Sequence, residues 1–410
     1  MATNFNAMTH VARATAGVNV VENPTEAGVP KEERIDVFTS LSYQQNVPVT
    51  SHDLCLPSFP VDFKTVHAPV GSRLQLFHQN WSTFCENQFV MNVLTYGYRL
   101  KFAEPPPLVC FPKPYELSLN TTQQSILDDE LQKFLDNNVI QPADPSTPGF
   151  YSPVFLREKP RHDLTEPIKY RVIIDLSFLN RFLVKKHFKM ESTNTIRNTL
   201  QVGDSFFSLD LTMAYNTIPM HAASRKYLRF WWHGKPFEFT ALCFGLSTAP
   251  WLFSLIMSEM CKYLHKFSCH CIFYLDDCLF KDKQISRLVS NQPLILFFIQ
   301  SCGWVINFPK SQLAITQRGV YVGTDYELVL GMVFPPQDRW IKLQRKISAF
   351  LHISQASAHQ WSSLMGTITS CQDLTPLGRL MARDLQIHIS QHWKDRTNKH
   401  IIIPVTANNK

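Results

Sequence analysis

The stretch that decides the fold is Ser268–Phe280, SCHCIFYLDDCLF. Its only full charges are the adjacent carboxylates Asp276 and Asp277, which lie between apolar, strand-forming residues. The stretch is predicted to form a hairpin, and a tight turn by itself would account for two aspartates. Adjacent carboxylates repel each other, however, and ionisation is costly in an apolar setting. A bound cation would remove both costs, so the pair is a candidate metal site.

A second acidic position strengthens this hypothesis. Asp210 lies near the end of a predicted strand, Phe206–Leu211, although an aspartate there would also suit the N-cap of a helix. The interval between Asp210 and Asp276 is long enough for a hairpin and a helix, so both strands can enter one sheet. Three carboxylates at neighbouring strand ends form a hard, oxygen-rich site that suits Mg²⁺. Two such ions about 4 Å apart can activate a 3′-hydroxyl and stabilise a leaving pyrophosphate, so the predicted chemistry is nucleotidyl transfer.

The sequence around these carboxylates resembles the motifs of reverse transcriptases. Tyr274–Asp277 (YLDD) is similar to the YxDD box, and Leu209–Tyr215 is similar to the first catalytic motif of that family. Leu242–Pro250 (LCFGLSTAP) resembles the LPFGLSSAP loop of retrotransposon enzymes, with Cys243 in place of the usual proline. The three segments occur in the family's order and spacing, which makes the resemblance specific.

The resemblance also implies which residues act. The catalytic residues, which would hold two Mg²⁺ ions that Mn²⁺ can replace, are Asp210, Asp276 and Asp277. The expected nucleotide-binding residues are Lys159, Arg171, Leu211, Ala214, Tyr215, Phe244, Gly245 and Lys310. The resemblance implies that Tyr274, Leu330 and Gly331 bind the primer or template. Four basic residues are expected to do so for a different reason, because they lie on one predicted helix and can face phosphates: Arg339, Lys342, Arg345 and Lys346. Tyr215 is expected to lie beside the sugar, where its ring would exclude a 2′-hydroxyl, with core packing as the alternative role. For the two nucleotide-binding lysines the alternative is an ordinary surface position.

The expected architecture is an α+β, right-hand polymerase fold. Residues 113–205 would form the fingers and 206–334 the palm, an antiparallel sheet with helices that carries the carboxylates. Residues 335–395 would form a helical thumb or connection, and 396–410 a tail. Residues 1–112 would form an N-terminal extension, with the first 50 residues loosely ordered.

Local patterns predict several elements directly. Thr121 and Gln124 fit a capping box at the start of a helix, and Ser357 and Gln360 fit a second one. Residues 227–242 alternate enough for two strands around the turn His233-Gly234. Further helices are predicted over 251–264, 340–351 and 377–393, and further strands over 152–156 and 170–176.

Composition and charge limit the function classes. The 410 residues are 45% hydrophobic and 18% charged, with only 14 glycines, which excludes a disordered chain, a collagen or a charged coiled coil. Of the net charge of +7, most lies beyond residue 335. A basic C-terminal region suggests a polyanion partner, although a solvated, lysine-rich tail would look the same.

The cysteine spacing and the hydropathy of the chain indicate which metal sites and which cellular location to expect. The ten cysteines include no C-x-x-C pair, so zinc-ribbon and zinc-finger sites are not expected. Cys269 and Cys271 are interpreted as small core residues rather than metal ligands. The sequence shows no secretory signal and no apolar run long enough to span a membrane, so the protein is expected to be intracellular, in the cytoplasm or nucleus, without a membrane partner.

The expected function is that of an RNA-directed DNA polymerase domain that uses an RNA template, a DNA or RNA primer and dNTPs. Residues 71–107 and Leu377–Leu380 resemble DIRS-type, tyrosine-recombinase retrotransposon polymerases, and no carboxylate set of an RNase H domain follows residue 395. Two alternatives stay open. One is a catalytically silent, nucleic-acid-binding remnant of a retroelement. The other is a viral RNA-dependent RNA polymerase, although those enzymes typically carry GDD rather than YxDD. The sequence predicts no oligomeric state.

Overall fold

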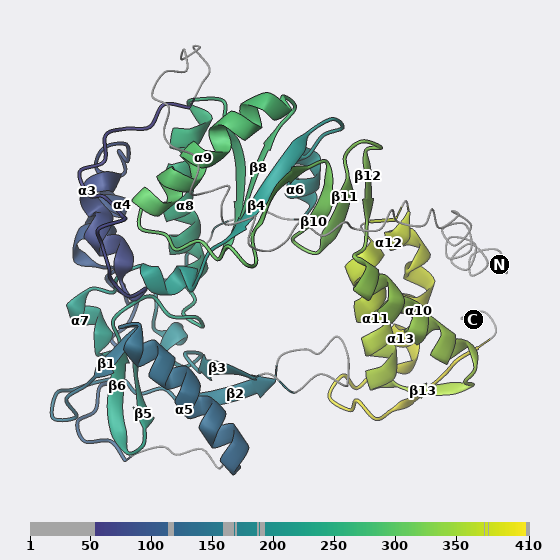
Figure 1. The fold of residues 1–410 in the computed structure, drawn as a ribbon. Coiled ribbons are helices and arrows are strands. Elements are labelled where there is room, and N and C mark those ends of the chain that lie inside the picture. Colours follow the sequence, from purple (N-terminus) through teal and green to yellow (C-terminus); the bar gives the residue numbers. More distant parts are fainter. Residues whose placement is uncertain are drawn as a thin grey trace. The chain divides into compact units, whose positions relative to one another are not determined.

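The computed structural model describes residues 54–113, 119–158, 168, 170–186, 188, 193–372, 374–375 and 377–406. These residues divide into two compact units (Figure 1). The larger unit contains residues up to 322 together with 326–332. The smaller unit contains residues 323–325 and those from 333 onward. Lys159 and the first 50 residues, for which the sequence makes predictions, lie outside the described residues.

The larger unit is built around a four-stranded antiparallel sheet in the order β7-β8-β4-β9 (Figure 1). Its strands are β4 (Ser205–Asp210), β7 (His270–Tyr274), β8 (Asp277–Asp282) and β9 (Gln312–Thr316). Helix α8 (Ala249–His265) packs beside β7, and α9 (Ile285–Ser301) packs against β8, β4 and β9. The sheet and these helices share one hydrophobic core, in which the apolar residues of β4 are almost fully buried.

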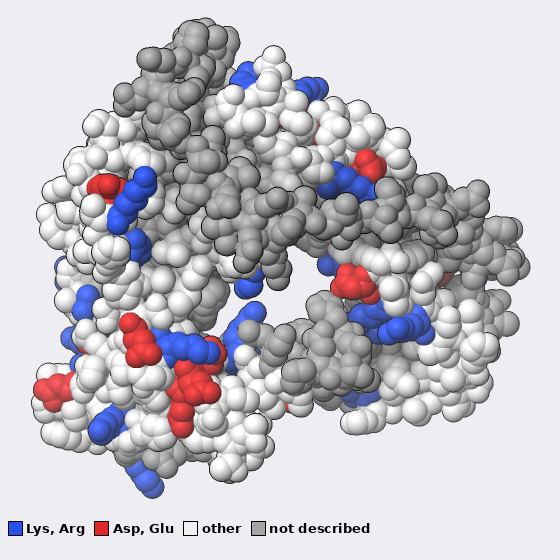
Figure 2. Space-filling view, viewed as in Figure 1, with Lys and Arg blue, Asp and Glu red and all other residues white. Residues whose placement is uncertain are grey.

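Two smaller sheets and a long helix also belong to the larger unit, and two strands of the first sheet lie between β4 and β7 in sequence. The strands β1 (Ile140–Pro142), β6 (Lys235–Phe239) and β5 (Arg229–Trp232) form one sheet, in that order. The strands β2 (Val154–Glu158) and β3 (Tyr170–Ile174) form an antiparallel hairpin. Helix α5 (Thr121–Asp136) precedes them, and acidic and basic side chains lie close together over it (Figure 2). The predicted turn at His233-Gly234 is confirmed, because β5 and β6 pair across it.

The segment from residue 54 to 100 packs into the same core as the central sheet. It contains the 3-10 helix η1 (Arg73–Phe77) and the helices α3 (His78–Trp81) and α4 (Gln88–Tyr96). The Trp81 Nε1 donates to the Cys302 carbonyl at 2.8 Å, and the Asn80 Nδ2 donates to the Ser301 carbonyl at 2.7 Å. These bonds satisfy buried polar groups at the C-terminal end of α9, where the last helical carbonyls lack intrahelical partners.

Several short helices and strands belong to the larger unit or to the stretch, residues 318–334, in which the chain alternates between the two units. They are η2 (Leu179–Arg181), α6 (Thr193–Thr199), η3 (Ala214–Thr217), α7 (Ala222–Arg225), β10 (Arg318–Tyr321), β11 (Thr324–Glu327) and β12 (Met332–Phe334). The last three form one sheet in the order β10-β11-β12.

The smaller unit is mainly helical. Its helices are α10 (Gln337–Leu351), α11 (Ala358–Gln372), α12 (Gly378–Met381) and α13 (Arg383–His392). The strands β13 (Gln355–Ser357) and β14 (Ile402–Pro404) pair antiparallel. A separate hydrophobic core surrounds Trp361, which is fully buried. No helix in the described part of the chain is long and apolar enough to span a membrane.

The structure confirms most predicted elements and corrects two details. The capping box of α5 begins one residue earlier than predicted: Asn120 is the N-cap, its Oδ1 accepts from the Gln123 N at 2.8 Å, and the Gln123 side chain returns to the Asn120 N. Asparagine is a stronger N-cap than the threonine that follows it. The capping box of Ser357 and Gln360 is confirmed. The helix predicted over 377–393 is two helices, because α12 ends before Ala382 and α13 begins after it.

Candidate active site

The carboxylates singled out by the sequence meet at one end of the central sheet. Asp210 ends β4 and Asp277 begins β8, and the two residues are directly paired across the strands. Tyr274 pairs with Asp277 on the other side of β8, so Leu275 and Asp276 form the turn of the β7–β8 hairpin. The Leu211 N donates to the Asp276 carbonyl at 3.1 Å, which ties the turn to the end of β4. The structure therefore brings all three carboxylates together.

The turn that presents Asp276 is conformationally unusual. Leu275 has a φ of 55°, a left-handed conformation that residues with a Cβ rarely adopt. Two-residue hairpin turns favour positive φ because their twist then matches that of the flanking strands. The apolar Leu275 side chain packs against the main core, and this contact offsets part of the backbone strain.

Asp210 is held by a residue that the sequence reasoning missed. The Asn307 Nδ2 donates to the Asp210 Oδ1 at 2.8 Å, and the Asn307 N donates to the Asp210 carbonyl at 2.8 Å. The Asp210 N donates to the Ser311 Oγ at 3.0 Å. Asn307 thus fixes one carboxylate oxygen and leaves the other available. An asparagine three residues before Lys310 was the available signal, but its partner Asp210 is nearly a hundred residues away in sequence.

The electrostatics of the site reflect three like charges at close range. Burial, followed by the charges of Asp276 and Asp210, raises the pKa of Asp277 from 3.8 to about 6, and Lys310 opposes the shift. Burial and then the charge of Asp276 raise the pKa of Tyr215 to about 12. A carboxyl whose pKa is raised by neighbouring carboxylates gains most from a bound cation, because the cation favours its ionised form.

Asp210, Asp276 and Asp277 are suitable ligands for divalent cations, provided that their side chains rotate toward one another. Carboxylate oxygens at strand ends are the ligands that Mg²⁺ prefers. The oxygens of the three aspartates do not all lie within 4.8 Å of one another. All three side chains are half-buried at the end of the sheet. Rotation about their side-chain torsions would bring the carboxylate oxygens close enough to share ions.

Tyr215 fills the space next to β4, the strand that ends with Asp210. It lies in η3 and is 3% exposed, with its ring 4.9 Å from that of Phe253 in a stacked arrangement. The ring of Phe244 lies 4.6 Å away on a side chain that is 58% exposed. The Tyr215 ring is therefore almost fully packed, and one of the rings that it contacts, that of Phe244, lies at the surface. Ala214 and Leu211 are buried beside it.

The loop that carries Phe244 and Gly245 is clamped by Asn180, a second residue that the sequence reasoning did not select. The Asn180 Nδ2 donates to the Gly245 carbonyl at 2.8 Å, and the Ser247 N donates to the Asn180 Oδ1 at 2.8 Å. Gly245 has a φ of 93°, and a Cβ there would lie 3.1 Å from the Ile174 carbonyl. Glycine thus allows both the backbone conformation and the close approach of the end of β3.

Basic residues on the β2–β3 hairpin form a cationic site. Arg171 is exposed on β3 and pairs in register with Arg157, which is exposed on β2. Like charges directly opposite one another in a sheet are destabilising, and an anion bound between the two side chains would offset this repulsion. Lys310 is exposed, and its charge acts on Asp277. The sequence did not single out Arg157.

Leu330 and Gly331, two of the expected primer- or template-binding residues, lie in the turn between β11 and β12. Leu330 is 64% exposed, and Gly331 has a φ of 68°. The Tyr321 hydroxyl of β10 donates to the Asp277 carbonyl at 3.0 Å, which ties the neighbouring strand to the catalytic hairpin. Tyr274 is half-buried, beside Asp277 in the hairpin.

The basic residues of α10 differ in their surroundings. The Lys346 Nζ donates to the Ser363 carbonyl and hydroxyl and to the Thr367 hydroxyl at 2.7–2.8 Å, and burial lowers its pKa. Lys342 and Arg345 are exposed. Lys346 therefore fastens α10 to α11, while the other two side chains face solvent. Figure 2 shows lysine and arginine side chains gathered over this part of the smaller unit.

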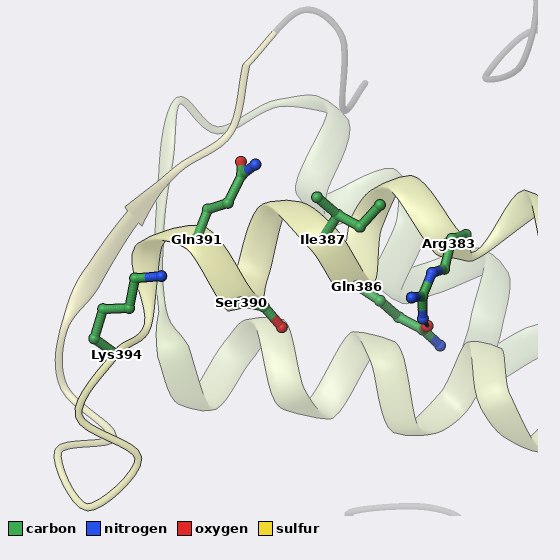
Figure 3. Close-up of a pocket in the computed structure, with 6 residues that line it drawn as sticks. All are labelled: Arg383, Gln386, Ile387, Ser390, Gln391 and Lys394. Carbon is green, nitrogen blue, oxygen red and sulfur yellow. Dashed lines mark hydrogen bonds between the residues drawn. The ribbon is translucent and has the colours of Figure 1, made fainter.

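A further basic surface of the smaller unit lies along α13. Arg383 at the start of α13 and Lys394, two residues after its end, line a shallow pocket together with Gln386, Ile387, Ser390 and Gln391 of the helix (Figure 3). A neighbouring pocket shares Arg383 and adds Arg379 and Gln372. The sequence predicted a basic C-terminal region but did not identify these residues.

Comparisons with known proteins identify a family model and relatives that this chain resembles. Residues 158–332 match the family model described as "Reverse transcriptase (RNA-dependent DNA polymerase)". The chain is 25% identical over 227 residues to the Gag-Pol polyprotein of walleye dermal sarcoma virus, covering 55% of this chain and 12% of that protein. It is 24% identical over 185 residues to the Pol polyprotein of transposon 297 of Drosophila melanogaster, covering 45% of this chain and 17% of that protein. The chain thus spans less than a fifth of the length of either relative.

Solved structures share the fold at low sequence identity. The foamy viral protease–reverse transcriptase in complex with double-stranded DNA aligns with a TM-score of 0.58 at 16% identity, over 84% of this chain and 59% of that chain. The same viral protein in complex with an RNA/DNA hybrid aligns with a TM-score of 0.54 at 15% identity, over 80% of this chain and 44% of that chain.

The chain has the fold of a right-hand polymerase, and the expected α+β fold class is confirmed. More particularly, residues 158–332 are a reverse transcriptase domain of the type found in retroelement and retroviral Pol proteins. Enzymes of this family use divalent metal ions.

Proposed function

We propose that the chain is an RNA-directed DNA polymerase, which extends a DNA or RNA primer on an RNA template with dNTPs. The observation that carries the proposal is the direct pairing of Asp210 with Asp277, with Asp276 in the adjoining turn. Three carboxylates at one end of a sheet, one of them with a raised pKa, form a site that is costly unless it serves a cation.

Two Mg²⁺ ions, when bound, would activate the 3′-hydroxyl of the primer and stabilise the leaving pyrophosphate, and Mn²⁺ would substitute. Asp210, Asp276 and Asp277 would hold these ions. Asn307 donates to one oxygen of Asp210 and would orient the other toward the site. Asn307 is therefore proposed as a positioning residue.

The triphosphate of the incoming nucleotide would be held by fixed cations. Arg171 offers a planar fork of donors to phosphate oxygens, and Arg157 adds a second fork on the neighbouring strand. Lys310 would supply a further point charge, or a proton to the leaving group. Tyr215 and Phe244 would contact the sugar and base, with the Tyr215 ring excluding a 2′-hydroxyl.

Primer extension tests this proposal. A labelled oligo-dT primer on poly-rA, with dTTP and Mg²⁺, should be extended by the wild-type chain, and Asp210→Asn should reduce the rate by about 100-fold or more. Asp144→Asn removes an exposed carboxylate in the same unit and should leave the rate unchanged. Duplex binding without extension under Mg²⁺ and Mn²⁺ would instead support the silent, nucleic-acid-binding remnant. Extension with ribonucleotides in preference to dNTPs would support an RNA polymerase.

We propose further that the domain is of the DIRS type, which rests on the resemblance of residues 71–107 and Leu377–Leu380. A sequence tree built from the palm motifs should group this chain with DIRS-type polymerases, and grouping with retroviral sequences would contradict the assignment.

A further inference from the structure

Two cysteines and a histidine lie together at the end of the palm hairpin remote from the catalytic turn. Cys261 and His265 lie one turn apart in α8, and Cys271 is the second residue of β7. The ligand atoms of all three residues lie within 4.8 Å of one another. The cluster joins the last turns of α8 to the first residues of β7, across a tight connection in which Ser268 has a φ of 54°.

The distances match those of a tetrahedral metal site. Bond lengths of about 2.3 Å for zinc–sulfur and about 2.0 Å for zinc–nitrogen place two sulfurs about 3.8 Å apart, and a sulfur and a nitrogen about 3.5 Å apart. The Cys261 Sγ lies 3.2 Å from the Cys271 Sγ, and the Cys271 Sγ lies 3.7 Å from the His265 Nε2. Changes of about 0.6 Å and about 0.2 Å would bring these two distances to the values of a tetrahedral site. The third pair, the Cys261 Sγ and a ring nitrogen of His265, lies within 4.8 Å.

The spacing in sequence also suits a shared ligand. Residues four apart on a helix lie on the same face, so Cys261 and His265 point to the same side of α8. That side faces β7, because α8 packs beside this strand. Cys271 is 6% exposed, Cys261 is half-buried and His265 is exposed, so the site opens to solvent on the histidine side. A fourth ligand position is therefore available to water.

The cluster differs in chemistry from the catalytic site. Thiolate and imidazole ligands select soft and borderline cations such as Zn²⁺, whereas the aspartates suit Mg²⁺. Two thiolates would balance the two charges of Zn²⁺, so the occupied site would carry no net charge next to the core. Cys271 is hydrogen-bonded to Cys261 and buried, and both effects raise the pKa of the Cys271 thiol, so binding of the ion would displace the proton of this thiol.

We propose that Cys261, His265 and Cys271 bind one Zn²⁺ ion that is distinct from the catalytic cations. The ion fastens the C-terminal end of α8 to the base of the hairpin whose turn carries Asp276. Cys271 thereby has a role beyond the core packing that its sequence context suggested. The proposal does not depend on the polymerase activity.

Cobalt titration of the full, reduced, metal-free chain tests the proposal. In excess Mg²⁺, which occupies the oxygen-rich site, one equivalent of Co²⁺ should produce a thiolate-to-cobalt charge-transfer band and intense visible ligand-field bands. One equivalent of Zn²⁺ should remove both. Cys271→Ser and Cys261→Ser should each weaken the charge-transfer band and lower the affinity by about tenfold or more. His265→Ala should lower the affinity while leaving both thiolates.

Control variants distinguish binding at this cluster from binding elsewhere and from loss of folding. Cys110→Ser replaces an exposed cysteine of the same unit and should leave the titration unchanged. Asp276→Asn should also keep the charge-transfer band, because carboxylates do not produce it. Serine variants whose circular dichroism matches that of the metal-free wild type have lost ligands rather than the fold. Absence of the band in the wild type, its persistence in Cys271→Ser, or a Cys261–Cys271 disulfide in place of zinc binding would each overturn the proposal.

Discussion

Asp277→Asn is expected to stabilise the metal-free protein while abolishing polymerisation. Asparagine has nearly the same shape as aspartate but carries no charge, so it removes the repulsion by Asp276 and Asp210. The backbone carbonyl of residue 277, which accepts from the Tyr321 hydroxyl, is unaffected. The substitution therefore changes the electrostatics of the site more than its packing.

The magnitude follows from the raised pKa. The pKa of Asp277 in the folded protein is about 6, against an ordinary 3.8. Between these values the folded protein binds a proton that the unfolded chain releases, so stability falls as pH rises through this window. Each unit corresponds to about 1.4 kcal/mol, and solvent screening of a half-buried group reduces the total to about 1–2 kcal/mol at pH 7. Asp277→Asn should recover this amount.

Thermal unfolding followed by tryptophan fluorescence, in a chelating buffer, measures the effect. At pH 7 the Tm of Asp277→Asn should exceed that of the wild type by about 2–6 °C, and the difference should shrink toward pH 4. Added Mg²⁺ should raise the Tm of the wild type more than that of the variant. A variant that is less stable than the wild type at pH 7, or a difference that does not change with pH, would refute the reasoning.

Asp282, at the other end of the same strand, provides a matched control. The Arg287 guanidinium donates to both carboxylate oxygens of Asp282, at 2.6 and 2.9 Å. Burial would raise the pKa of Asp282, but the hydrogen bonds and charges around the carboxylate outweigh this effect and the pKa is lowered. The stability that Asp282 contributes is present above its ordinary pKa and is lost as pH falls through the lowered value. Asp282→Asn should therefore destabilise the protein at pH 7, with the opposite sign to Asp277→Asn.

Three further predictions concern the nucleotide and the nucleic acid. Tyr215→Ala should lower the ratio of kcat/KM for dGTP over GTP by about tenfold to a hundredfold, because it removes the ring beside the sugar, and an unchanged ratio would assign the ring to the core alone. Asn307→Ala removes the donor that orients Asp210, so it should lower kcat more than it raises the KM for dNTPs and should weaken activation by Mg²⁺. If the variant instead fails to fold in a buffer that contains a chelator, the role of Asn307 is structural. Lys342→Ala with Arg345→Ala should lower the slope of log Kd against log salt for a primer–template by about two units, whereas Lys346→Ala should lower the Tm and leave the slope unchanged.

The catalytic hairpin was predictable because its signal is local. A charged pair inside an apolar, strand-forming run predicts a turn, and the structure places Asp276 in that turn. Asn307 and Asn180 were not predictable in the same way, since each acts through a partner distant in sequence. Polar side chains of this kind are common in loops, and only the fold shows which of them have partners.

The basic helix α10 shows the opposite limitation. Charge and helical spacing predicted that Lys346 would face phosphates, but the side chain reaches α11 and uses its donors there. A sequence specifies the face of a helix more readily than the direction of a long, flexible side chain. The break at Ala382 was missed for a related reason, because the apolar pattern of 377–393 continues through it.

The paired arginines of the β2–β3 hairpin have a consequence for protein engineering. Arg157 and Arg171 oppose each other across the strands, and their repulsion weakens the hairpin by about 0.2–1 kcal/mol. A screen for thermal stability would therefore favour Arg157→Glu, which converts the repulsion into an attraction. The same substitution would place a negative charge where a triphosphate is expected to bind. Selection for stability and selection for turnover would then move this position in opposite directions.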